Sequence, residues 1–211
     1  MNMRRIITLA LTLAFTLAAI AQTPQEIISR MEKAMEGHEE DGIEMIVDVK
    51  VPIIGTMTTR TWSLGGKSRI EGELMGVTMI TWTDGTTKWT YNENDNEIEI
   101  DNFNPDAPSD DSGDTDLFNG ITDGYDVTIK KEDAKAWYIR CKKSKSNKDK
   151  NAPKSMDLAV SKADYFPLSL SASASGLTMT MRGIKFGVSD KQVTFDPGNY
   201  PGAKITDKRK K

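Results

Sequence analysis

Apolar side chains recur at three- and four-residue spacing over residues 24–36, which predicts an amphipathic helix. We expect the helix to begin directly after Thr23, because Thr23 and Glu26 have the order of a capping box and Pro24 occupies the first helical position. One face of this helix needs an apolar surface to pack on. The residues on that face are Ile27, Ile28, Met31, Ala34 and Met35.

From residue 43 onward the apolar positions alternate with polar ones, which is the period of a strand with one buried face. Residues 43–51 show this most clearly, with Ile43, Met45, Val47, Val49 and Val51 at every second position. Turn signals rich in Gly, Asn and Asp separate similar segments, and the dipeptide at positions 84–85 is a strong hairpin signal.

The pattern predicts about ten or eleven antiparallel strands in one domain, with the last strand at residues 193–195. The predicted fold class is therefore mainly β with helices. A sheet with this many strands must curl or close, and the N-terminal helix would cover its concave side. Residues 102–116 break the pattern and read as a long acidic loop that leads into a short helix near residues 117–121. Residues 144–154 read as a hairpin tip.

The first 21 residues have the order of an export signal. Arg4 and Arg5 precede an apolar run over residues 6–20, and Ala19 and Ala21 form an A-x-A cleavage site. The run is shorter than the roughly 20 residues that a spanning helix needs. No cysteine follows the site to accept a lipid anchor. We expect cleavage after Ala21, a mature domain over residues 22–211, and a soluble periplasmic protein.

Composition narrows the functional classes. Hydrophobic residues make up 37% of the chain and charged residues 28%, which is typical of a soluble protein. The net charge of −3 argues against nucleic acid as a partner. A single cysteine and a single histidine argue against a disulfide framework, a zinc site and a His-dependent triad. We therefore expect a protein that is not an enzyme and that holds no cofactor or metal.

Two charged segments each allow a functional interpretation as well as a purely structural one. The aspartates within residues 110–116 lack the spacing of a calcium-binding loop, which favours a solvated loop. Six lysines occur in residues 142–154. They are either a solvated hairpin tip or a docking patch for anionic lipid or an acidic partner.

Three segments carry a family resemblance. The first is Trp62, two strands after the helix. The second is residues 80–92, which read Ile-Thr-Trp-Thr-Asp-Gly-Thr-Thr-Lys-Trp-Thr-Tyr-Asn, and the third is residues 193–205, with a Phe-Asp-Pro and a Pro-Gly-Ala-Lys-Ile. In order and spacing these segments resemble the LolA/LolB family of periplasmic lipoprotein carriers.

The resemblance implies an unclosed β-barrel with a helical lid over an apolar cavity. It implies a carrier that takes lipoprotein acyl chains from an inner-membrane transporter to an outer-membrane acceptor. The missing lipid-anchor cysteine places the chain on the LolA-like side. The family's latch arginine, which follows the tryptophan closely, has no counterpart at the matching place. Arg60 and Arg69 are the nearest arginines, and neither is assigned that role.

Methionine is frequent on the predicted strands, and its flexible side chain suits surfaces that fit varied apolar ligands. An ordinary core that uses methionine is the plain alternative. A LolA-like envelope sensor that binds lipid and signals to a partner protein is the functional alternative, and a filled barrel that binds nothing is another. The candidate cavity residues are Met31, Met35, Met45, Val47, Met57, Trp62, Met79, Trp89, Met179 and Met181.

Overall fold

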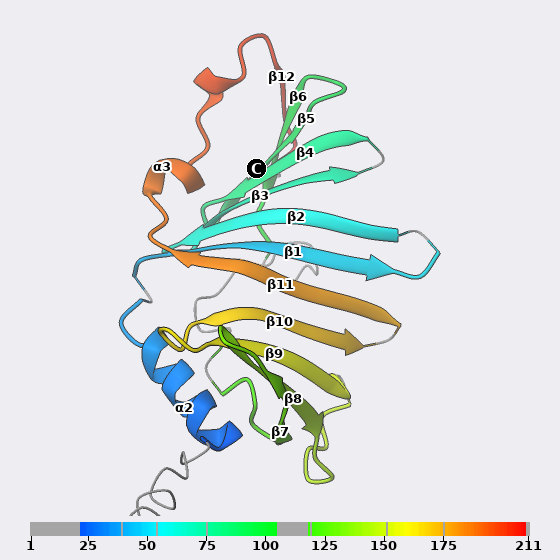
Figure 1. Ribbon diagram of the computed structural model, residues 1–211. Helices are drawn as coiled ribbons and strands as arrows, with labels where there is room; N and C mark the ends of the chain where they lie inside the picture. Colours follow the sequence, from blue (N-terminus) through cyan, green and yellow to red (C-terminus); the bar gives the residue numbers. More distant parts are fainter. Residues whose placement is uncertain are drawn as a thin grey trace, which may run out of the picture.

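The computed structural model describes residues 22–38, 40–53, 55–74, 76–104, 118, 120–150, 152–174 and 176–209. Within these ranges twelve strands form one sheet (Figure 1). The predicted signal peptide with its cleavage site, and residues 105–116 of the predicted acidic loop, lie outside the described residues. Of the short helix predicted near residues 117–121, residues 117 and 119 also lie outside them, and Phe118 has a 3-10 conformation.

The first six strands are β1 (Ile43–Val51), β2 (Gly55–Leu64), β3 (Lys67–Leu74), β4 (Val77–Thr83), β5 (Thr87–Asn92) and β6 (Glu97–Asn102). The other six are β7 (Tyr125–Glu132), β8 (Ala136–Lys143), β9 (Ser155–Ser161), β10 (Pro167–Ala174), β11 (Leu177–Phe186) and β12 (Lys204–Asp207). The helices are α2 (Pro24–Met35), α3 (Asp190–Val193) and the 3-10 helix η2 (Pro197–Asn199).

The strand order is β12-β6-β5-β4-β3-β2-β1-β11-β10-β9-β8-β7. Strands β1 to β6 form one antiparallel meander and β7 to β11 form another, and the pairing of β1 with β11 joins them. Strand β12 is added in parallel beside β6. The two edge strands, β12 and β7, do not pair with each other, so the sheet is not closed. The predicted class, a mainly β fold with an unclosed antiparallel barrel, is confirmed, with twelve strands in place of ten or eleven.

Helix α2 begins as the sequence predicts. The Glu26 amide donates to Thr23 Oγ1 at 3.2 Å, and the Thr23 amide donates to Glu26 Oε2 at 2.8 Å, which completes the capping box. Ile27, Ile28 and Met31 are buried against the sheet. The main core forms where these three side chains meet strands β1, β8, β9 and β10, so α2 covers one half of one face of the sheet.

The two faces of the sheet carry different elements. Ile43 and Met45 of β1 pack against α2, whereas Glu44 between them points to the other side, because neighbouring residues of a strand alternate. Glu44 pairs with Trp62 of β2, and Trp62 packs against Val193 of α3. Helices α2 and α3 therefore lie on opposite faces, which we call the α2 face and the α3 face.

The C-terminal segment differs from the sequence prediction. The sequence predicts a strand over residues 193–195, but helix α3 ends at Val193 instead. The Ser189 amide donates to Gln192 Oε1 at 2.8 Å, so a second capping box starts a short helix and outweighs the strand propensity of the residues that follow. The actual last strand is β12, which the alternation did not reveal because it is only four residues long.

Candidate functional site

Two apolar rows cross seven strands on the α2 face. Residues that pair directly across neighbouring strands share a face, so the register aligns them into continuous rows. The outer row is Met57, Val49, Met179, Ala172, Met156, Cys141 and Val127, in the order β2-β1-β11-β10-β9-β8-β7. The inner row, in the same strand order, is Thr59, Val47, Met181, Leu170, Leu158, Ile139 and Ile129.

The rows run from the core out to an open surface. At β8 and β9 their side chains are buried beneath α2, as Cys141 and Leu158 are. At β1, β2 and β11 they are only half-buried, and Met179 is 42% exposed. Strands lie about 4.8 Å apart, so the half-open stretch from β2 to β10 is roughly 14 Å wide. The apolar surface thus extends well beyond what the helix covers.

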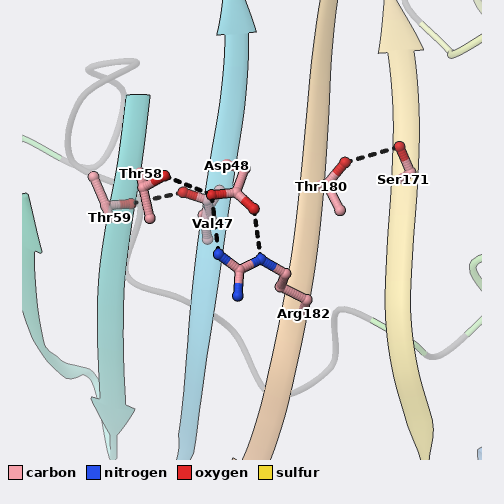
Figure 2. Close-up of polar contacts among 7 residues, drawn as sticks. All are labelled: Val47, Asp48, Thr58, Thr59, Ser171, Thr180 and Arg182. Carbon is pink, nitrogen blue, oxygen red and sulfur yellow. Dashed lines mark hydrogen bonds and ion pairs between the residues drawn. The ribbon is translucent and has the colours of Figure 1, made fainter. Parts of the chain in front are cut away.

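The opposite face of the same strands is polar, as Figure 2 shows. Arg182 Nε donates to Asp48 Oδ2 at 2.6 Å and Thr58 Oγ1 donates to Asp48 Oδ1 at 2.7 Å, while the hydroxyls of Ser171 and Thr180 lie 3.0 Å apart. The hydrogen bonds from Arg182 and then Thr58 hold the pKa of Asp48 below its usual range. Neither apolar row contains a charged residue. This sharp division singles out the α2 face as the one suited to apolar ligands.

The structure does not bring all ten predicted cavity residues together. Eight lie on the α2 face, but Trp62 and Trp89 lie on the α3 face. The reason is the two-residue period of a strand: Trp62 is five positions from Met57, and an odd separation reverses the side. The eight on the α2 face are Met31, Met35, Met45, Val47, Met57, Met79, Met179 and Met181.

Met79 stands apart from the other seven. It shares their face, but Thr59 and Gly72 lie between it and Val47 along the row. Beyond β2 the α2 face is lined mainly by small and polar residues, such as Gly72, Thr81 and Thr90. Ile70 and Met79 are large apolar exceptions.

The predicted tryptophans instead build an aromatic cluster on the α3 face. The Trp82 ring lies 5.4 Å from Phe195 and 5.6 Å from Tyr200, and the Trp89 ring stacks on Phe195 at 5.3 Å. Trp82 and Trp89 pair across their hairpin, and Phe195 contacts both. The cluster packs the C-terminal segment against strands β4 and β5, so the role of these tryptophans is structural.

The two candidate latch arginines belong to the same face. Arg69 lies 5.1 Å from the Trp62 ring and 5.6 Å from the Trp82 ring, and it is ion-paired to Glu71. Arg60 lies 5.5 Å from the Trp62 ring. Since α2 packs on the other side of the sheet, neither arginine reaches it.

Helix α2 is held instead by Tyr165, in the turn between β9 and β10. Its hydroxyl accepts hydrogen bonds from Gln22 Nε2 at 2.9 Å and from Arg30 Nη1 at 2.8 Å, and Arg30 also lies 5.3 Å from the ring centre. The hydrogen bonds from Gln22 and Arg30 lower the pKa of Tyr165. Tyr165 has φ of 63°, a left-handed conformation that is unusual for an aromatic residue.

The one cysteine of the sequence offers a built-in probe of the covered part of the rows. Cys141 is 1% exposed, and burial raises its pKa to about 11. A thiol in such an apolar site is neutral at pH 8 and unreactive. We expect a maleimide to label the native protein at pH 8 at least about a hundredfold more slowly than the urea-unfolded protein. Equal rates would show that the rows beneath α2 are open to solvent.

Sequence reasoning missed Val49 and Ala172, which join the methionines into one row. Val49 was visible as part of the alternation in residues 43–51. Ala172 gave no signal, because its place in the row depends on the pairing of β10 with β11.

The described residues offer less support for metal binding or for a membrane-spanning helix. No group of three or more His, Cys, Asp or Glu side chains there is placed to hold a metal ion. Over the same residues, no helix combines the length and the apolar character needed to cross a membrane. A hollow of about 680 Å³ adjoins the open end of the rows and is lined in part by Ala174, Leu177, Lys150 and Lys154.

Solved structures share this architecture. LprF from Mycobacterium bovis matches with a TM-score of 0.52 and 14% identity, covering 80% of this chain and 96% of LprF. The fold is LolA-like. At this identity the match is one of fold, and it agrees with the resemblance in residues 80–92 and 193–205.

Two further structures match less closely. An uncharacterized conserved protein from Thermus thermophilus has a TM-score of 0.45 and 18% identity, covering 87% of this chain and 98% of its own. A LolA superfamily protein from Nitrosomonas europaea has a TM-score of 0.34 and 11% identity, covering 83% of this chain and 99% of its own. No family model matches the sequence, and no curated protein matches it.

Proposed function

We propose that this chain is a periplasmic carrier that holds acyl chains of lipoproteins or other lipids on the half-open apolar rows of the α2 face. The observation that carries the proposal is the continuity of these rows from the core to a half-exposed surface without a charged residue. The LolA-like fold, which the chain shares with LprF, supports it.

The energetics favour such a surface for acylated cargo. Each methylene exposed to water costs about 0.8 kcal/mol, so a chain of ~16 carbons costs on the order of 12 kcal/mol. Met57, Met179 and Met181 are flexible, so they can adjust to chains of different length or branching. The protein acts by binding and shielding rather than by catalysis. In this proposal it takes cargo from an inner-membrane transporter and gives it to an outer-membrane acceptor.

Mass spectrometry of an organic extract from the purified protein tests the proposal. We expect acylated lipids or lipoproteins to co-purify in about stoichiometric amount, and we expect the polypeptide to begin at Gln22. An extract without acyl chains would contradict acyl binding, and a mature polypeptide that begins at Met1 would contradict export with cleavage. Capture of partners separates two roles: transporter components indicate a carrier, whereas a regulatory membrane protein indicates the sensor alternative.

We also propose that α2 is a lid over the buried part of the rows. Tyr165 accepts hydrogen bonds from both Gln22 and Arg30, so it restrains the lid beside the apolar packing of its buried face. Replacement of Tyr165 by Phe removes the accepting oxygen but keeps the ring. We expect α2 amides to exchange hydrogen about tenfold faster in Tyr165→Phe, since two hydrogen bonds near the surface contribute roughly 1 kcal/mol or more.

Hydrogen exchange with and without an acylated ligand measures this effect. The strands around Val47 should keep their protection in Tyr165→Phe, and bound ligand should slow exchange in α2. If α2 is as protected as the central strands in both proteins, it is a fixed part of the core and not a lid.

A further inference from the structure

A basic and apolar rim lies along one end of the sheet, where three connections follow one another (Figure 1). These are the β1–β2 hairpin tip, the β10–β11 hairpin tip and the β8–β9 loop. The first two are adjacent, because Lys50 pairs with Thr178 immediately before both tips. The second and third line the same hollow of about 680 Å³, to which Leu177 and Thr178 contribute from one side and Lys150 and Lys154 from the other.

The apolar members of this rim are exposed. Ile53, at the β1–β2 tip, is fully exposed, and Leu177, at the β10–β11 tip, is 43% exposed. Ile53 has φ of 73°, in the left-handed region that disfavours β-branched residues and suits glycine or asparagine. Neither the backbone conformation nor burial accounts for isoleucine at this position. Contact of this side chain with a partner outside the folded chain accounts for it.

The charged members are basic and lack acidic partners. Residues 142–154 contain six lysines and one aspartate, whereas the whole chain has a net charge of −3. Within the described residues no carboxylate forms an ion pair with Lys50, Lys150 or Lys154. Their positive charge is therefore available to an anionic partner.

We propose that this rim docks onto the surface of a bilayer that contains anionic phospholipid. Lysines beside exposed aliphatic side chains match the two layers of such a surface. The ammonium groups reach the phosphate headgroups, and Ile53 and Leu177 enter the boundary with the acyl chains. An acidic protein partner would match the lysines but would leave a fully exposed isoleucine unexplained. Docking at this end also sets the open end of the apolar rows against the membrane.

Flotation of the purified protein with vesicles tests the proposal. We expect binding to vesicles of 30% phosphatidylglycerol in phosphatidylcholine, little binding to pure phosphatidylcholine, and weaker binding as salt is raised. Lys150→Gln combined with Lys154→Gln should weaken binding about fivefold for each lysine removed. Ile53→Ser combined with Leu177→Ser should weaken it by roughly tenfold or more.

Matched controls come from the other half of the sheet. Ile205→Ser removes an exposed aliphatic residue from β12, and Lys191→Gln removes an exposed lysine from α3; both should float as the wild type does. The proposal is wrong if anionic and neutral vesicles bind equally, if the rim variants bind as the wild type, or if the controls lose binding too. Competition by a monomeric short-chain phosphatidylglycerol would instead reveal a pocket for one headgroup and would overturn surface docking.

The result is independent of acyl-chain binding. Ile53→Ser should take up a fluorescent fatty acid in solution as the wild type does, because Ile53 lies in the tip beyond the rows. Failure of docking would therefore leave the carrier proposal intact, and failure of fatty-acid uptake would leave docking intact.

Discussion

Met179→Glu is expected to lower the affinity for a fluorescent fatty acid at least about thirtyfold. The substitution places a carboxylate in the middle of the outer apolar row, where it is adjacent to Val49 and Ala172. An unpaired charge against an acyl chain costs about 2 kcal/mol or more. The protein should still fold, because Met179 is 42% exposed and the charge can reach water when the site is empty. Titration of the probe, with circular dichroism as a check on folding, measures the effect.

Thr178→Glu is the matched control for this prediction. Thr178 is the neighbour of Met179 on the α3 face, where it pairs with Lys50, so the same charge is placed on the polar side of the same strand. Its affinity for the probe should equal that of the wild type, and Met179→Leu should also bind normally. An equal loss in Thr178→Glu would mean that net charge, rather than the apolar row, determines binding.

Trp82→Ala is expected to lower the free energy of unfolding by about 3–5 kcal/mol, because it removes a large side chain that is only 3% exposed. The loss disconnects Phe195 and Tyr200 from strand β4. Urea unfolding measures it. The folded fraction should bind the fatty acid with unchanged affinity, since this cluster lies on the face away from the apolar rows.

Trp137→Ala provides the comparison on the other face. Trp137 packs against the core beneath α2, and its ring stacks on Tyr165 at 5.3 Å. It should destabilise the protein and also change the affinity for the probe, because the restraint on α2 is disturbed. If Trp82→Ala alters probe affinity as much as Trp137→Ala, the assignment of ligand binding to the α2 face and of structural packing to the α3 face is wrong.

The sequence predicted most of the architecture because the relevant signals are local. The capping box at Thr23 and the alternation that begins at Ile43 each depend on a few neighbouring residues, and the structure confirms both. Helix α3 was missed although its capping box was present, because Val193 lies in a segment of strong strand propensity. Strand β12 could not be found locally, since it depends on pairing with β6 from the middle of the chain.

The candidate site was predictable in part. Strand period alone separates Met57 from Trp62 and Met79 from Trp82, because both separations are odd, so the division of the tryptophans from the methionines could have been read from the sequence. The continuity of the rows could not, because it requires the pairing of β1 with β11 across more than a hundred residues. The contact of Arg30 with Tyr165 is equally distant in sequence.

Crosslinking with a photoreactive fatty acid tests the central claim most directly, because it maps where the acyl chain lies. The purified protein is irradiated with a diazirine-bearing fatty acid, digested, and the labelled residues are located by mass spectrometry. We predict labels at Val47, Val49, Met57, Met179 and Met181, with labelling lost in Met179→Glu and kept in Thr178→Glu. Labels concentrated on Trp62, Trp82 and Trp89, or spread evenly over both faces, would contradict the claim that the α2 face holds the lipid.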